Sequence, residues 1–201
     1  YMYSGNYSLM INSYLNHLIL VPTDMQRVKS KLRMVMQMDI NSNLTGILKS
    51  KLLEYSQNNP DNLQLADMLL WFSMQTKDFD MAFRQARSID MRFDNAEKNM
   101  MELAYIAYSN YNYEVAANAY GYVKNKKVNG QYTTDAWVGY YLAVCMSADE
   151  NQDTDMSTYE DLEEQGIEAV NELGINNITS DLIVQLSEIT AFKLVHAIRK
   201  L

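Results

Sequence analysis

Several residue types on which protein chemistry commonly depends are scarce in this chain. Among 201 residues there are one cysteine, two histidines, two prolines and seven glycines. One cysteine excludes an internal disulfide and a CxxC zinc site, and two histidines leave a structural zinc site short of ligands. The few glycines and prolines supply little turn chemistry for a many-stranded sheet. The sequence therefore favours an all-helical protein with few of the residues that commonly serve in catalysis or metal binding.

Basic charge and long apolar runs are also lacking. The net charge is -8, from 25 acidic and 17 basic residues, whereas a nucleic-acid-binding face needs clustered cations. No window approaches the roughly 18 consecutive apolar residues of a membrane span. The first ten residues, YMYSGNYSLM, have neither a basic leader nor an apolar signal core. We expect no nucleic-acid partner and no membrane span, and we interpret the chain as part of a longer one.

What the sequence does contain is an internal repeat. The segment 77–82 (KDFDMA) aligns with 111–116 (YNYEVA), which gives a repeat period of about 34 residues. Residues one period apart are apolar or small on both sides of these segments: Leu69 with Leu103, Phe79 with Tyr113, Ala82 with Ala116, Ala86 with Tyr120, and Ile89 with Val123. Such spacings line one face of a helix pair.

Extending this pattern predicts ten helices. We expect them at 6–20, 23–39, 43–57, 61–75, 79–91, 95–109, 113–125, 133–148, 157–172 and 181–200. They form pairs at 23–57, 61–91, 95–125 and 133–172, preceded by a lone second helix at 6–20. The last helix is expected to begin after a Ser180 cap and to close the array, with an apolar stripe of Ile183, Leu186, Thr190, Leu194, Ala197 and Leu201.

The period and the residues at the turns resemble those of the tetratricopeptide repeat (TPR) family. The match is carried by Leu103-Ala104, Asn112-Tyr113 and Ala116, and by the turn at Lys77-Asp78-Phe79. This resemblance implies one array over residues 1–201, an all-α right-handed solenoid of antiparallel helix pairs. The richness in Asn, Tyr and Met is also similar to that of repeat proteins of gut Bacteroidetes. That resemblance implies a bacterial cell-envelope or periplasmic location in preference to the cytoplasm.

In such arrays the first helix of each pair lines a concave groove. The residues expected to project into it are Arg33, Met34, Gln37, Asp67, Met68, Trp71, Met74, Met101, Glu102, Tyr105 and Tyr108. Methionine and aromatic side chains suit apolar peptide anchors, whereas packing against neighbouring helices explains the same residues equally well. Because Arg33 is the only cation among these positions, a site for a peptide carboxylate is not expected.

One acidic segment, at residues 149–160, has oxygen-bearing side chains at the spacing of an EF-hand calcium loop. The ligands would be Asp149, Asn151, Asp153, Asp155, Ser157 and Glu160. Thr154 stands where the sharp turn of such a loop uses glycine. An acidic loop that ends in a helix cap explains the same residues, so both readings stay open.

No catalytic motif is present. Cys145 lies within a predicted helix, where a buried and inert thiol is expected. His17 falls on an expected inward helix face and is interpreted as a hydrogen-bonded packing residue, and His196 lies on the last helix. The chain has no glycine-rich phosphate loop, HExxH or GxSxG. We therefore do not expect an enzyme.

These observations indicate a scaffold that binds a protein or peptide in its groove. The first alternative is a cell-envelope module for carbohydrate or another ligand, which would need solvent-exposed Trp71 and Tyr105 to stack on a sugar ring. The second is a calcium-binding helical module. The inward stripe of Met10, Tyr14 and His17 lacks one partner helix, which predicts self-association through the N-terminal end.

Overall fold

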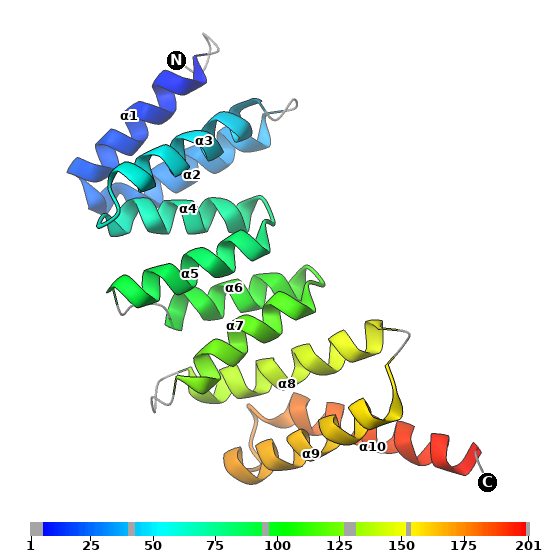
Figure 1. Cartoon of the computed structure of the whole chain (residues 1–201). Helices are drawn as coiled ribbons and strands as arrows, with labels where there is room; N and C mark the ends of the chain where they lie inside the picture. Colours follow the sequence, from blue (N-terminus) through cyan, green and yellow to red (C-terminus); the bar gives the residue numbers. More distant parts are fainter. Residues whose placement is uncertain (1–5, 40–42, 94–96, 127–131, 152–153, 200–201) are drawn as a thin grey trace. The chain divides into compact units, whose positions relative to one another are not determined.

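A computed structural model of the chain describes residues 6–39, 43–93, 97–126, 132–151 and 154–199 (Figure 1). All regular structure within these ranges is helical, as the composition predicts. The helices are α1 (Tyr7–Leu20), a short 3-10 turn η2 (Pro22–Asp24), α2 (Met25–Gln37), α3 (Asn43–Asn58), α4 (Leu63–Gln75), α5 (Phe79–Phe93), α6 (Glu97–Ser109), α7 (Tyr113–Asn125), α8 (Thr133–Glu150), α9 (Met156–Leu173) and α10 (Ser180–Arg199).

The ten predicted helices are confirmed, and their bounds differ from the predicted ones by at most two residues. Side-chain caps explain several starts. Asn6, Asn62 and Asn112 each accept a hydrogen bond from the backbone N–H three residues later, at 3.3, 3.0 and 3.1 Å. Such caps satisfy a donor that the first turn of a helix leaves unpaired.

The same turn joins α4 to α5 and α6 to α7. Lys77 and Tyr111 adopt left-handed backbone conformations, with φ of 58° and 63°. The next residue, Asp78 or Asn112, donates its N–H to a carbonyl five positions back, at 2.9 and 3.0 Å. This is the Schellman pattern that ends a helix. Because Lys77 and Tyr111 are one repeat period apart, the repeat found in the sequence is also a repeat of local backbone structure.

The chain divides into two compact units, residues 1–96 and 97–201. In the first unit, α4 is the central element, because α1, α2, α3 and α5 all contact it. Its sequence LQLADMLLWFSMQ is apolar on nearly every side, and a helix of that kind is usually buried. Nine of its residues are buried: Leu65, Ala66, Met68, Leu69, Leu70, Trp71, Phe72, Ser73 and Met74.

In the second unit, α7 packs closely against both α6 and α8. Gly139 on α8 permits this approach, since a Cβ there would lie 2.6 Å from the ring of Tyr120 on α7. Helices α9 and α10 pack on each other and on α8. Their shared core comprises Val138, Tyr141, Cys145, Leu162, Ala169, Leu182 and Ile189.

The expected stripe on the last helix is confirmed at Leu186, which packs against the core of the second unit, and is wrong at Thr190 and Leu194. The side chain of Ala197 and residue Leu201 lie outside the described part of the chain. Leu182 and Ile189 are the buried positions of α10, whereas Leu194 is 62% exposed and Thr190 is also exposed. Apolar residues occupy two faces of this helix, so periodicity alone could not select the inner one. The outer face therefore carries Val184, Leu194, Val195 and Ile198.

In the described part of the chain, no helix is both long enough and apolar enough to cross a membrane. The lack of a long apolar run in the sequence predicts the same.

Candidate functional site

The predicted groove residues of α2 are on the surface of the first unit. Arg33, Met34 and Gln37 are all exposed. The Arg33 Nε donates a hydrogen bond to Gln75 Oε1 at 2.9 Å, and its guanidinium carbon lies 6.0 Å from the centre of the Trp71 ring. Arg33 and Trp71 therefore lie close together, as is expected of two residues of one groove.

Trp71 itself is not exposed, however. The sequence analysis placed Trp71 on the opposite side of α4 from buried Leu69, yet Trp71 is only 4% exposed. Met68 and Met74 are buried as well, and Asp67 is half-buried. The expectation of exposure is wrong for these α4 residues because α4 packs against α1, α2, α3 and α5, which together cover most of its surface. A carbohydrate ring could not stack on a tryptophan buried in this way.

The predicted residues of α6, in the second unit, have a different environment. Leu103, Ala104 and Ala107 are fully buried and fix the helix, whereas Tyr105 is 68% exposed. Glu102 is exposed and Met101 half-buried.

Tyr108, the last predicted groove residue, is half-buried beside Tyr113, with ring centres 5.2 Å apart in an edge-on arrangement. Burial, followed by the neighbouring Tyr113, raises the pKa of the Tyr108 hydroxyl. Tyr108 is therefore partly a packing residue, and Tyr105 remains the exposed aromatic side chain of α6.

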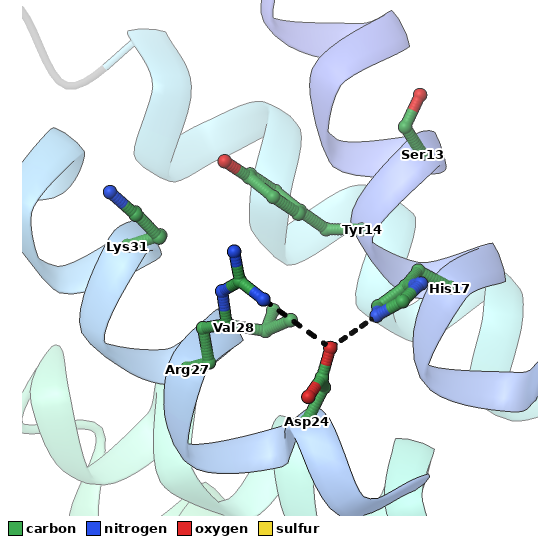
Figure 2. A pocket seen from close by; sticks show the side chains of 7 residues that line it. All are labelled: Ser13, Tyr14, His17, Asp24, Arg27, Val28 and Lys31. Atoms are coloured by element: carbon green, nitrogen blue, oxygen red, sulfur yellow. Dashed lines mark hydrogen bonds and ion pairs between the residues drawn. The ribbon is translucent and has the colours of Figure 1, made fainter. Parts of the chain in front are cut away.

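A pocket of about 380 Å³ lies between α1 and α2 in the first unit. Figure 2 shows it lined by residues of both helices and of the turn between them: Ser13, Tyr14, His17, Asp24, Arg27, Val28 and Lys31. His17 Nε2 is 2.7 Å from Asp24 Oδ2, and an Arg27 guanidinium nitrogen is 4.0 Å from the same oxygen. One carboxylate oxygen thus orients a histidine and an arginine at the edge of the pocket.

The position of His17 corrects the sequence analysis. It is hydrogen-bonded as expected, but its side chain is 44% exposed and lines the pocket instead of packing inward. The inward positions of α1 are Met10, as the sequence predicts, together with Ile11, Leu15 and Leu18. Sequence reasoning also missed Arg27 and Lys31 as pocket residues, although their spacing of four places both on one face of α2.

The acidic loop before α9 is engaged mainly in starting that helix. Asp155 Oδ1 accepts hydrogen bonds from the Thr158 N–H and the Ser157 hydroxyl, at 3.0 and 2.8 Å, and these bonds lower the pKa of its carboxyl group. Asp149 accepts one from the Tyr159 hydroxyl at 3.3 Å. Within the described residues no three His, Cys, Asp or Glu side chains gather as metal ligands would, and Asp153 of the predicted calcium loop lies outside those residues.

Cys145 is buried, as the sequence analysis expects. Its residue is 1% exposed, and burial raises the pKa of the thiol to about 12. A thiol in that state is protonated at neutral pH and is a poor nucleophile. Cys145 therefore packs in the core of the second unit.

Comparison with known proteins assigns no family to the chain. A scan against protein-family models finds no match. A search of curated proteins also finds no significant match. Functional inference therefore rests on the surfaces and contacts described above.

Proposed function

We propose that this protein is a TPR-like helical scaffold that binds a protein or peptide through exposed side chains of its first helices. The observation that carries the proposal is Tyr105, which is 68% exposed on a helix whose neighbouring positions are fully buried. Tyrosine offers a large amphipathic contact area with few torsions to immobilise, and it is enriched at the energetic centres of interfaces.

The environment of Tyr105 suits such a contact. The buried side of α6 is anchored in the core by Leu103, Ala104 and Ala107. The helix that carries the Tyr105 ring is therefore held firmly in position. Exposed Glu102 lies on the preceding turn and can pair with a cation of the partner. This combination of one aromatic anchor and a polar rim is typical of a binding surface.

A separate candidate contact in the first unit is formed by two α2 residues, Arg33 and Met34. Met34 is 39% exposed, and Arg33 is held by Gln75 above the buried ring of Trp71. An arginine oriented in this way loses little freedom on binding. The tetratricopeptide assignment and the right-handed solenoid belong to the same proposal, and the turn that recurs at Lys77 and Tyr111, one repeat period apart, supports them.

The experiment is a selection of displayed random peptides on the purified chain, followed by affinity measurement for the selected peptides. Tyr105→Ala should weaken binding by at least about tenfold, which corresponds to about 1.4 kcal/mol. Its free energy of unfolding should change by less than about 1 kcal/mol, because the ring is exposed.

Tyr111 provides a matched control. It is 74% exposed, but it lies in the turn after α6 and not on the face of a first helix. Tyr111→Ala should leave peptide affinity unchanged. Selected peptides that bind Tyr105→Ala as tightly as the unmodified chain would show that this surface is not the binding site.

A further inference from the structure

The pocket between α1 and α2 has a chemistry that the scaffold function does not use. We propose that it binds a small organic monocarboxylate, with the acid group at Arg27 and Lys31 and the apolar body against Tyr14 and Val28. None of these residues belongs to the proposed peptide surface. The pocket can therefore hold its ligand whether or not the scaffold proposal is correct.

The cations are placed to receive an anion. Arg27 and Lys31 are one helical turn apart on α2, and both line the pocket. Arg27 approaches Asp24 with one guanidinium nitrogen at 4.0 Å, and a guanidinium has five N–H donors in a planar fork. Donors are therefore left for a second carboxylate, whose two oxygens the fork can contact together.

The charge of the lining favours a monoanion. Two cations, Arg27 and Lys31, stand against the one carboxylate of Asp24, which leaves a single net positive charge from these three side chains. A carboxylate balances that charge, whereas a phosphate dianion would leave excess negative charge beside Asp24. The basic lining is also unusual in a chain whose net charge is -8.

The remaining walls suit an apolar body. Val28 is 3% exposed, and Tyr14 packs against the core of the first unit. Figure 2 shows the Tyr14 ring reaching from α1 across the space that Arg27 and Lys31 face. The pocket volume of about 380 Å³ lies within the range of small-molecule sites, roughly 300 to 1,000 Å³. An aromatic acid, or an aliphatic acid of several carbons, would fill it, whereas acetate would leave the apolar wall uncovered.

The test is a titration of the full chain with benzoate, acetate and inorganic phosphate, followed by amide NMR shifts. Benzoate should shift the amide signals of residues 13–31, with a dissociation constant on the order of 1 mM. Acetate and phosphate should bind at least about tenfold more weakly, because acetate lacks the apolar body and phosphate carries excess charge. Absence of benzoate shifts at about 10 mM, ten times that constant, would overturn the proposal.

Charge variants on one helix supply the control. Lys31→Gln should weaken benzoate binding at least about tenfold, as expected for the loss of a charged hydrogen bond. Lys29→Gln makes the same charge change on α2 at a position that does not line the pocket, and it should leave the affinity unchanged. Equal losses in both variants, or tighter binding of phosphate than of benzoate, would show only non-specific attraction of anions.

Discussion

Lys77 and Tyr111 are one repeat period apart, and they are the only residues other than glycine with positive φ in the described parts of the chain. Each ends the first helix of a pair and is followed by Asp78 or Asn112, whose side chain accepts a hydrogen bond from the N–H three residues later. The turn between the two helices of a pair thus has the same backbone conformation in both repeats. Similar side chains recur because the same turn has to be made again.

Replacing Lys77 with glycine should stabilise the protein. A side chain in the left-handed region costs about 1 kcal/mol, which glycine does not incur. Lys77 is exposed, so its removal opens no cavity. We expect Lys77→Gly to raise the free energy of unfolding by about 0.5–1 kcal/mol, less than the full strain because glycine is also more flexible when unfolded. Urea unfolding followed by circular dichroism measures the change.

Lys77→Ala is the control for this prediction. Alanine removes the charge and the long side chain but keeps the Cβ that the left-handed conformation disfavours. It should therefore bring no gain in stability. A gain equal to that of Lys77→Gly would show that the side chain, and not the backbone conformation, was responsible.

Two helical glycines should respond to alanine in opposite directions. A Cβ added at Gly46 on α3 would meet no neighbouring atom within 4 Å, whereas at Gly139 that carbon would lie 2.6 Å from the ring of buried Tyr120. Gly46→Ala should stabilise the chain by about 0.5–1 kcal/mol through helix propensity. Gly139→Ala should destabilise it by about 1–2 kcal/mol, because overpacking outweighs the same gain. Stabilisation by both, in urea unfolding, would mean that α7 and α8 approach less closely.

The junction of α9 with α10 should depend on pH through Glu163. Its carboxylate accepts hydrogen bonds from Lys193 and from the Thr190 hydroxyl, and these bonds lower the pKa of Glu163 below its usual value of 4.5. A carboxyl whose pKa is lower in the folded state stabilises the fold above that usual value and loses this contribution as the pH falls through the folded pKa.

Glu163→Gln should therefore have a lower melting temperature than the unmodified chain at pH 7. The difference should shrink as the pH falls below 4.5 and through the lowered pKa of folded Glu163, because both chains then carry a neutral group at position 163. Melting curves between pH 3 and pH 7 test this. Glu164, the next residue, is exposed, so Glu164→Gln should have little effect on the melting temperature and is the control. A melting-temperature difference between Glu163→Gln and the unmodified chain that stays constant over this pH range would contradict the role given to Glu163.

The sequence predicted the bounds of the helices better than it predicted which of their residues are exposed. Periodicity located α5 because its buried residues Ala82, Ala86 and Ile89 recur about once per turn, and it placed Leu69 and Leu103 in the core correctly. It failed where a helix has more than one apolar face, because the neighbours decide which face is covered. The α1–α2 pocket escaped notice for a related reason, since His17 and Asp24 come into contact only after the intervening turn is formed.

Trp71 is the sharpest test of the corrected surface. Its ring is buried in the core of the first unit, and in the described structure its indole N–H has no hydrogen-bond partner. Trp71→Ala should lower the free energy of unfolding by about 3–5 kcal/mol, because it leaves a large cavity. Trp71→Phe retains most of the ring and removes the unpartnered donor, so its cost should be much smaller. Urea unfolding of both variants measures these changes. If Trp71→Ala lowers the free energy of unfolding by less than about 1 kcal/mol, Trp71 is an exposed groove residue, as the sequence predicted.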